Sequence, residues 1–392
     1  MKILSVNAGS SSLKFQLYDM PQEKVLISGL MERIGVGNSF YTIKVNNAKI
    51  KKEVELNNHE EAFEALVKEL KANNVVESLE DIKGIGHRIV QGGDYFDKTV
   101  VINDEVLSKI EELSSLAPLH NPAAVTGIKA AMEVFPSAVQ TAVFDTAFHQ
   151  TMPKENYLYA LPYNWYTDYK VRRYGAHGTS HKYVSERMNE ILGRKDTKLI
   201  TCHIGNGASI SAIVNGKCID TSMGLTPNAG LIMGTRCGDI DAAILPFLME
   251  KEGLDAKGLS DLMNKKSGVY GMTGISSDFR DIEDAAAQNN ELAQVALESY
   301  AKKVKKYIGS YAAEMNGVDA VVFTAGVGEN GIDMRADIMA NMDFLGMKLD
   351  EEANKVRGKE RVISTEDSKV KILLIPTNEE LMIARDTLEL VK

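Results

Sequence analysis

Cysteine is scarce in this chain of 392 residues, which contains only Cys202, Cys218 and Cys237. The three cysteines form no C-x-x-C pair, and no histidines stand near them at zinc-finger spacing. The sequence therefore predicts neither a disulfide framework nor a structural zinc site. Unpaired thiols of this kind are typical of the reducing cytoplasm.

Long hydrophobic runs and clusters of one charge sign are also missing. The apolar start at residues 1–4 passes directly into a polar Asn/Gly/Ser stretch, which argues against a signal peptide or a membrane anchor. The net charge of −9 is spread along the chain, and this argues against nucleic acid as a partner. An anionic substrate would have to be bound by local cations.

The P-loop pattern G-x-x-x-x-G-K-[ST] is absent, which excludes that class of nucleotide site. A G-x-G-x-x-G pattern does occur at Gly326, Gly328 and Gly331, after the apolar stretch 321–325. Alone it would suggest a dinucleotide-binding dehydrogenase, but no following strand ends in the acidic residue that this fingerprint needs. We rank a dehydrogenase third among the possible functions of this chain.

What is present is the composition of an ordinary globular protein, with 44% hydrophobic and 25% charged residues. The length predicts two domains. Periodicity near the N-terminus predicts several strands, then a helix, then a further strand. Their expected ranges are 2–6, 13–18, 24–34, 40–45 and 49–56 for the strands, 60–72 for the helix, and a last strand ending at 84–88.

An apolar strand, an Asn/Gly/Ser turn and a second apolar strand occur at residues 4–17 and again at 199–214. A loose repeat over so long a distance predicts two related domains rather than a solenoid. We place the first at residues 1–148, joined by a returning C-terminal helix at 381–392, and the second at 149–380. Helical periodicity in that last segment already begins at Glu379.

Both hairpin turns are suited to phosphate, because small side chains let backbone N–H groups approach an anion closely. Lys14 adds a positive charge just beyond the first turn. Either hairpin alone is better explained by an ordinary β-turn. Their occurrence at equivalent places in two related domains favours phosphate binding.

Cationic side chains in predicted turns are candidates for binding anions. They are His87 with Arg88, Arg172 with Arg173, His177, and Arg236. A surface ion pair would explain any single arginine, but the glycines around Arg88 and Arg236 set those two apart, as exposed backbone does in binding loops.

Two histidines, His177 and His181, stand four residues apart, as a metal pair on one helix face would. We favour instead a loop that enters a helix, with Thr179 or Ser180 as the capping residue. His177 would then point into a binding site.

Two acids that follow apolar strands, Asp145 and Glu379, are candidates for magnesium or proton handling, because α/β sheets bind ligands at such strand ends. The alternative for Glu379 is a purely structural place in the first turn of a helix.

Taken together, these segments resemble the acetate kinase (acetokinase) family over nearly the whole chain. The matching stretches are 5–14, 86–88, 144–149, 172–175, 177–181, 203–209, 233–236, 323–326 and 377–380. The resemblance implies an α/β fold of the actin-like ATPase type: duplicated ribonuclease H-like βββαβαβα domains with a central cleft for ATP. It also implies a homodimer.

The resemblance further implies which residues bind the nucleotide and the metal. Mg²⁺, or Mn²⁺ in its place, would be held by Asn7 and Glu379. The phosphates would lie near Lys14, His203, Ile204, Gly205, Asn206 and Gly207. The rest of the ATP or ADP molecule would lie against Asp278, Phe279, Arg280, Gly326, Val327, Gly328, Glu329 and Asn330.

The implied activity is reversible, direct in-line transfer of the γ-phosphoryl group of ATP to acetate, giving acetyl phosphate and ADP, a step of acetyl-CoA biosynthesis. A carboxylate is already ionised at neutral pH and needs no strong base, so positioning and positive charge should dominate catalysis. We assign Arg88 to the substrate carboxylate and Arg236 with His177 to the transferring phosphoryl group. Asp145 would orient a cation or a water.

The chain departs from the family at one position, with Ala176 where the family motif often has phenylalanine before the histidine. That phenylalanine would line the acyl pocket with Val90, Leu119 and Pro227, so a propionate kinase is the nearest alternative. A non-catalytic, actin-like ATP switch is the alternative from another class. The glycine-flanked arginines argue against it.

Overall fold

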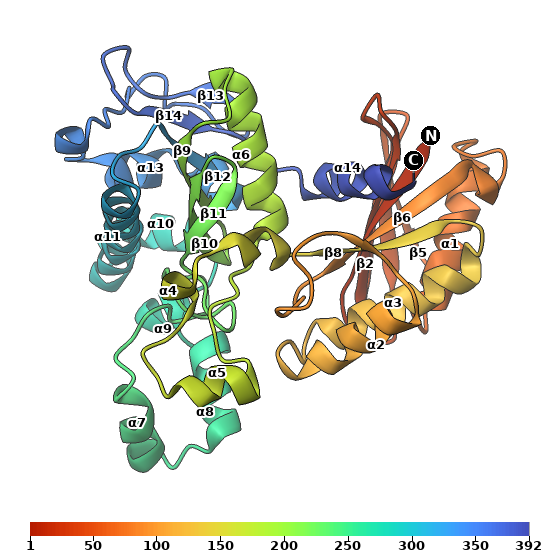
Figure 1. Ribbon diagram of the computed structural model, residues 1–392, viewed down its shortest axis with the longest axis horizontal. Helices are drawn as coiled ribbons and strands as arrows, with labels where there is room; N and C mark the ends of the chain where they lie inside the picture. The colour runs from red at the N-terminus through yellow and green to blue at the C-terminus, as the bar shows by residue number, and fades with distance from the viewer. Residues whose placement is uncertain (392) are drawn as a thin grey trace. The chain divides into compact units, whose positions relative to one another are not determined.

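The computed structural model describes residues 1–391, which form two compact units, each considered by itself (Figure 1). The first contains Met1–Gln150 and the chain from Asn378 onward, and the second contains Thr151–Thr377. The predicted limits at residues 148 and 380 differ from these by two and three residues. Lys392, the last residue of the predicted terminal helix, lies outside the described residues.

The first unit is an eight-stranded sheet with helices on both faces, its strands in the order β5-β4-β3-β2-β1-β6-β8-β7. Its elements are β1 (Lys2–Ala8), β2 (Ser12–Asp19), β3 (Lys24–Glu32), β4 (Phe40–Val45), β5 (Ala48–Glu53), α1 (His59–Ala72), β6 (Ile82–Ile89), β7 (Val100–Val101), α2 (Asp104–Glu112), α3 (Asn121–Val134), β8 (Val139–Phe144) and α14 (Glu379–Val391). The predicted strands and the predicted helix of residues 60–72 are confirmed, with ends that differ by a few residues.

The central strands of this sheet are covered on both sides because their side chains alternate between two helical layers. Ile85 of β6 belongs to the apolar cluster that includes residues of α1 and α3. Its neighbours Gly84 and Gly86 face α14, where an added Cβ would lie 2.7 Å from Val391 and 2.3 Å from Thr387. Only glycine lets α14 pack this closely, and that packing fixes the first turn of α14 beside the strand ends.

The second unit is built on a six-stranded sheet with strand order β11-β10-β9-β12-β14-β13. Its strands are β9 (Lys198–Ile204), β10 (Ala208–Val214), β11 (Lys217–Thr221), β12 (Ala320–Thr324), β13 (Arg361–Val362) and β14 (Lys371–Leu374). Its helices are α4 (Lys154–Tyr157), α5 (Tyr163–Tyr169), α6 (Gly178–Leu192), α7 (Ile244–Glu252), α8 (Ala256–Lys265), α9 (Gly268–Thr273), α10 (Phe279–Ala287), α11 (Glu291–Glu314), α12 (Ala325–Asn330) and α13 (Ile332–Met339).

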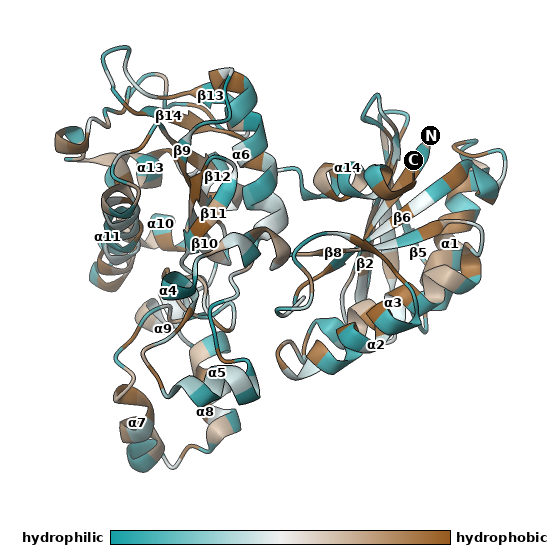
Figure 2. Ribbon diagram, in the orientation of Figure 1, coloured by the Kyte–Doolittle hydropathy of each residue, from teal (hydrophilic) through white to brown (hydrophobic). Residues whose placement is uncertain are grey.

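The two sheets share one topology, which confirms the predicted duplication. In each, a three-stranded antiparallel meander (β3-β2-β1 or β11-β10-β9) continues through two parallel strands, β6 and β8 or β12 and β14. The inner strands are nearly continuous apolar runs, drawn mostly brown for β9 in Figure 2, as expected for strands covered on both faces.

The second sheet separates an apolar face from a polar one. Ile200, Cys202 and Ile204 of β9 join the apolar cluster that contains the buried residues of α11. The alternate residues Thr201 and His203 face α6, to which both are hydrogen-bonded. The polar face carries most of the candidate site in this unit.

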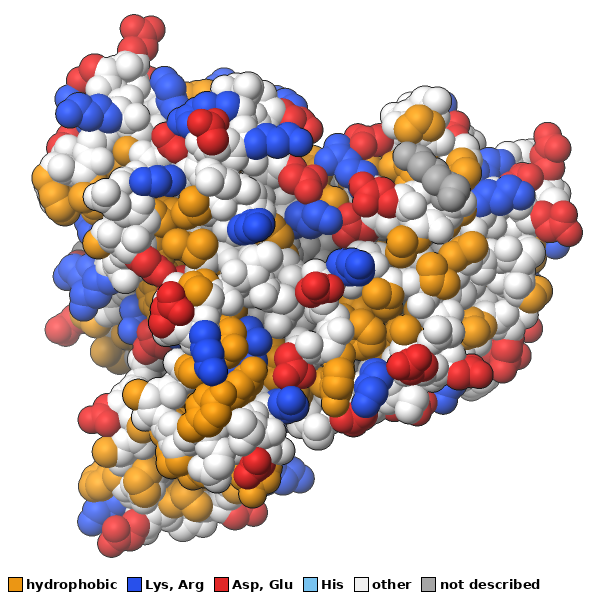
Figure 3. Space-filling view, in the orientation of Figure 1, with side chains coloured by type: hydrophobic (Ala, Val, Ile, Leu, Met, Phe, Trp, Pro, Cys, Tyr) orange, Lys and Arg blue, Asp and Glu red, His pale blue; other side chains and the backbone are white. Residues whose placement is uncertain are grey.

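No helix among residues 1–391 is both long and apolar enough to cross a membrane. On the face seen in Figure 3, lysine and arginine side chains are interspersed with aspartate and glutamate.

Candidate active site

In the first unit, Arg88 and Asp145 meet where two parallel strands end. Arg88 is the penultimate residue of β6, and Asp145 directly follows β8, with its backbone N–H bonded to the Ile89 carbonyl at 2.9 Å. Arg88 Nη2 lies 2.5 Å from Asp145 Oδ2, and the aspartate side chain is only 1% exposed. His87 and Arg88 are both strand residues, which agrees with the predicted strand ending at 84–88 and not with their grouping among turn residues, and their side chains point to opposite faces.

The guanidinium of Arg88 keeps donors for a ligand. Its Nε is buried and has no hydrogen-bond partner within residues 1–391. The carboxylates of Asp145 and Glu379 hold the pKa of Arg88 above its ordinary value in spite of burial. A permanently charged group with an unpaired buried donor is suited to binding a carboxylate.

His87 belongs to the fold rather than to the site. It is 2% exposed, and its Nε2 lies 2.8 Å from Gln140 Oε1. Burial lowers the pKa of His87 to about 4, so the ring is neutral at pH 7 and adds no positive charge to the site.

The first turn of α14 brings more charge to these strand ends. Glu379 begins this helix, as predicted, and Lys14 of β2 forms an ion pair with Glu380. Burial, with repulsion from Asp145 and Glu380, raises the pKa of Glu379 to about 7 in spite of the attraction of Arg88 and Lys14. The acids of this cluster are therefore incompletely neutralised by its two cations.

The side chains of Asn7 and Glu379 offer oxygen atoms of the kind that bind magnesium. Asn7 lies in β1 directly opposite Lys14, so the hairpin places an amide oxygen beside the cluster's lysine. No group of three or more His, Cys, Asp or Glu side chains within residues 1–391 is arranged to enclose a metal. Mg²⁺ is commonly bound by one or two protein oxygens together with water and substrate phosphates, and Asn7 and Glu379 match that pattern.

In the second unit, the polar face carries a chain of hydrogen bonds that includes His177. His177 Nδ1 lies 2.9 Å from Ser209 Oγ, which lies 2.8 Å from His181 Nε2. His181 Nδ1 lies 2.7 Å from Thr201 Oγ1. The His177 ring also stacks on the ring of His203, with 4.1 Å between their centroids.

The predicted capping of α6 is wrong. His177, not Thr179 or Ser180, occupies the position before the helix, with a left-handed backbone (φ 58°) and no capping hydrogen bond from its side chain. Ser180 instead lies 2.7 Å from His203 Nδ1 and 2.7 Å from Thr377 Oγ1. The strained backbone directs the His177 ring over β10 instead of along the helix.

Arg236 lies in a loop between β11 and α7, as its flanking glycines predicted. Its Nη1 donates to the Pro227 carbonyl at 3.0 Å, and it has no salt bridge to any acid in residues 1–391. Burial lowers its pKa relative to an ordinary arginine. A Cβ added to Gly207 would approach both His177 Nε2 (3.5 Å) and Arg236 Nη1 (3.6 Å), so the two cation-type groups border the same small space.

The loop of Arg236 is closed by Asp239. Asp239 Oδ1 accepts the Gly230 N–H at 2.7 Å, and the Asp239 N–H donates to the Gly230 carbonyl at 3.0 Å. Asp239 Oδ2 accepts from the Tyr307 hydroxyl at 2.6 Å and lies 3.6 Å from Lys303 Nζ, both on α11. One carboxylate therefore ties the loop to itself and to a long helix.

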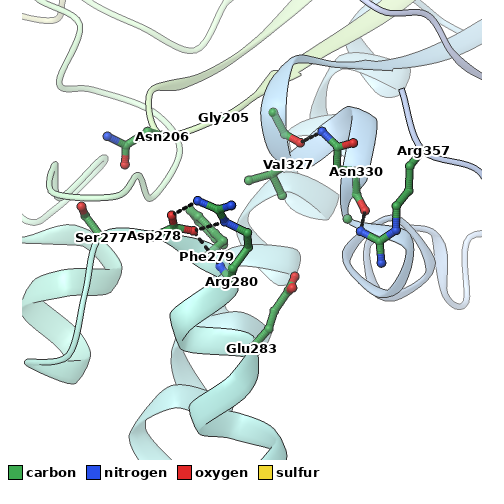
Figure 4. Close-up of a pocket in the computed structure, with 12 residues that line it drawn as sticks. Gly205, Asn206, Ser277, Asp278, Phe279, Arg280, Glu283, Val327, Asn330 and Arg357 are labelled. Atoms are coloured by element: carbon green, nitrogen blue, oxygen red, sulfur yellow. Dashed lines mark hydrogen bonds and ion pairs between the residues drawn. The ribbon is translucent and has the colours of Figure 1, made fainter. Parts of the chain in front are cut away.

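A cavity of about 650 Å³ lies beside this site in the second unit (Figure 4). Such a volume is within the range of small-molecule and cofactor sites. The cavity is lined by Gly205, Asn206, Ser277, Asp278, Phe279, Arg280, Glu283, Gly326, Val327, Asn330, Gly331 and Arg357.

Most residues predicted to bind the nucleotide line this cavity. Asp278 caps α10 and pairs with Arg280 at 2.5 Å, which Figure 4 shows at the cavity wall. The G-x-G-x-x-G segment forms a short helix, α12, and not an open turn. Buried Arg335 holds that helix by donating to the Gly328 carbonyl at 2.8 Å.

Five of the predicted nucleotide residues in this unit do not line the cavity: His203, Ile204, Gly207, Gly328 and Glu329. Ile204 is fully buried in the apolar cluster, and Glu329 Oε1 accepts the backbone N–H of Ala325 at 2.9 Å. Sequence reasoning missed four residues that do line it: Ser277, Glu283, Gly331 and Arg357.

The predicted acyl-pocket residues are divided between the units. Val90 is partly buried and the Leu119 side chain is 69% exposed in the first unit. In the second unit, Pro227 bonds Arg236 through its carbonyl. Ala176 is 5% exposed and packs within the apolar cluster.

The other predicted arginine pair is structural. Arg173 Nη1 donates to three consecutive carbonyls, of Thr221, Ser222 and Met223, at 2.7–3.3 Å. The guanidinium of Arg172 lies over the ring of Tyr157, 3.7 Å from its centroid.

Comparison with known proteins shows the family and the fold of this chain. The acetokinase family model matches residues 2–385. Acetate kinase of Clostridioides difficile is 64% identical, with all of both chains aligned. The crystal structure of Porphyromonas gingivalis acetate kinase superposes with a TM-score of 0.96 at 50% identity and full coverage of both chains. The structure of a propionate kinase from Francisella tularensis gives 0.93 at 44% identity, over 99% of each chain.

Proposed function

This chain belongs to the acetokinase family, and on that premise we propose how its residues carry out phosphoryl transfer. The activity is that of an acetate kinase, a phosphotransferase with a carboxyl group as acceptor. It moves a phosphoryl group between ATP and acetate. The non-catalytic switch and the dehydrogenase are thereby set aside.

Arg88 binds the acetate carboxylate. The observation that carries this role is its buried, unpartnered Nε on a guanidinium that is already fixed by Asp145. Acetate is ionised at neutral pH and attacks without general-base assistance. Asp145 is therefore a positioning residue for Arg88 and is not required to accept a proton.

Arg236 and His177 stabilise the transferring phosphoryl group. Both border the space in front of Gly207, and among residues 1–391 no acid forms an ion pair with Arg236. Charge that spreads over the phosphoryl oxygens during in-line transfer is best stabilised by fixed donors that no other anion occupies.

Asn7 and Glu379 hold Mg²⁺, which neutralises phosphate charge when bound. The nucleotide occupies the cavity next to Phe279 and Val327. Its phosphates extend toward Gly205 and Gly207, where the absence of side chains leaves the backbone open to them.

Propionate is the second candidate acceptor. Ala176 stands where the family often has the larger phenylalanine, and the structurally similar protein from Francisella tularensis is named a propionate kinase. One additional methylene changes kcat/KM by only about 10- to 200-fold. Comparison of kcat/KM for acetate, propionate and butyrate decides between the two acceptors.

We also propose a cytoplasmic homodimer. The three cysteines are free, as in a reducing compartment. Seven large apolar side chains of one region are 36–57% exposed: Ile240, Ile244, Phe247, Met249, Tyr270, Met272 and Ile275. Figure 3 shows apolar side chains gathered over α7, and such a patch is typical of an interface.

The role of Arg88 is tested by Arg88→Ala. We expect the KM for acetate to rise at least tenfold while the KM for ATP stays within twofold, because a charge-assisted hydrogen bond of ~1.5–3 kcal/mol is lost. Arg187→Ala, which removes an exposed ion pair with Glu360, is the matched control. An unchanged acetate KM in Arg88→Ala would remove Arg88 from the acyl site.

A further inference from the structure

Ser209 joins two histidines that the fold places on different elements. The serine is on β10, while His177 and His181 lie at the start of α6 and one turn into it. The serine hydroxyl is 2.9 Å from His177 Nδ1 and 2.8 Å from His181 Nε2, and Ser209 and His181 are fully buried. A single hydroxyl therefore contacts both rings where water has no access.

The number of protons on these side chains limits the directions in which their hydrogen bonds can run. A neutral imidazole has one N–H donor and one acceptor nitrogen, and a hydroxyl donates one proton. If the Thr201 hydroxyl donates to His181 Nδ1, then His181 Nε2 donates to Ser209. The Ser209 hydroxyl can then donate to His177 Nδ1, which leaves the proton of His177 on Nε2. The reverse direction places that proton on Nδ1.

Two observations favour the first direction. The His177 ring stacks on His203 at an interplanar angle of 20°, and its Nε2 borders the same space as Arg236 Nη1. A neutral His177 ring avoids a second positive charge beside the Arg236 guanidinium. A neutral ring can donate to a phosphoryl oxygen through Nε2 only if Nδ1 carries no proton, and an unprotonated Nδ1 can accept from the Ser209 hydroxyl.

We propose that Ser209 is a positioning residue whose hydroxyl donates to His177 Nδ1 and so presents the Nε2–H to the transferring phosphoryl group. His181 and Thr201 supply the rest of an oriented chain of donors. This inference rests on the proposed role of His177, but its first test does not depend on activity.

The direct test is ¹⁵N NMR of the full-length protein labelled in its seven histidines, with the His177 signals identified by their loss in His177→Gln. We expect a protonated Nε2 and an unprotonated, hydrogen-bonded Nδ1. In Ser209→Ala the two tautomers of His177 should become mixed. A proton on Nδ1, or on both nitrogens, of His177 in the unsubstituted protein would overturn the proposal.

Kinetics separate positioning from folding. Ser209→Ala should lower kcat about tenfold, as expected for the loss of one hydrogen bond, with the KM for ATP within twofold. In a His177→Ala background the same change should have no further effect. An unchanged kcat in Ser209→Ala would contradict the role of Ser209 while leaving the proposed function intact.

Ser211→Ala is the matched control. Ser211 lies on the same face of β10, is fully buried and bonds the Thr221 hydroxyl at 2.8 Å rather than a histidine. We expect its kcat to stay within twofold of wild type. An equal loss in both serine variants would assign the effect to the strand and not to His177.

Discussion

At the scale of single residues, the two arginines of the site differ in the partners that they have. Arg88 is fixed by a buried carboxylate and retains one unpartnered donor. Within residues 1–391, Arg236 has carbonyl and sulfur partners and no acidic one. The first arrangement suits a substrate that stays charged throughout, and the second suits charge that develops during the reaction.

Arg236→Ala should lower kcat by about 10³- to 10⁵-fold, or roughly 4–7 kcal/mol of barrier, by analogy with arginine fingers. Arg236→Lys should recover little of this loss, because an ammonium cannot form the planar two-point contact. Steady-state kinetics with saturating acetate and ATP measure the effect. Activity of Arg236→Ala within tenfold of wild type would exclude the assigned role.

His87 makes stability depend on pH. Its folded-state pKa of about 4 is below its ordinary 6.5, so the unfolded chain binds more protons between these values and acid favours unfolding. The free energy of unfolding should therefore be fully maintained above pH 6.5 and fall as the pH decreases toward 4. Relative to His87→Gln, wild type should lose roughly 2 kcal/mol between pH 7.5 and 5 in urea denaturation. Parallel pH profiles for the two proteins would contradict this.

Some single-residue features could be predicted from the sequence and others could not. The glycines around Arg236 indicated a binding loop because glycine permits backbone conformations and close approaches that such loops need. Glu283 was detectable, since it lies one helical turn after Phe279. Arg357 was not, because its contact with the Asn330 carbonyl joins residues 27 apart with no pattern between them.

At the scale of elements, two helices hold parts of the site in place. Helix α11 carries Tyr307 and Lys303, both of which contact Asp239 at the end of the Arg236 loop. Helix α14 brings Glu379 to the strand ends because two glycines of β6 let it approach. Hydrophobic periodicity predicted α14, whereas α11 was not predicted from the sequence. The left-handed start of α6 was not predicted either, since His177 has no local sequence signal for positive φ.

Asp239→Ala should loosen the Arg236 loop from α11. We expect kcat to fall about tenfold with little change in the KM for ATP, because hydrogen bonds to Gly230 and Tyr307 are lost. Glu298→Ala, which removes an exposed ion pair on the same helix, should have no effect on kcat. A loss of ATP binding with normal kcat would contradict a role in holding Arg236.

At the scale of the whole molecule, one duplicated architecture carries two different sets of chemical groups. The first sheet ends in an arginine, two acids and an amide, and the second ends in histidines, an arginine loop and a cavity. The duplication could be predicted from the repeated hairpin. Which residues each copy contributes became clear only through the family resemblance, because turn chemistry alone does not distinguish a phosphate loop from an ordinary turn.

The exposed apolar region around α7 should form the dimer interface. Phe247 is its most exposed large side chain, at 57%. Phe247→Glu should place a charge in that interface and shift the protein toward monomer in size-exclusion chromatography with light scattering. Leu292→Glu, on the separate helix α11 and 56% exposed, is the matched control. Identical masses for wild type and Phe247→Glu would contradict this placement.

The measurement that bears most directly on the central claim is acyl-phosphate formation from ATP, Mg²⁺ and a carboxylic acid, trapped with hydroxylamine. We expect product that depends on acetate, with propionate as the weaker acceptor and butyrate weaker still, and loss of product in Arg88→Ala at low acetate. ATP hydrolysis without acyl phosphate from any of the three acids would contradict transfer to a carboxylate.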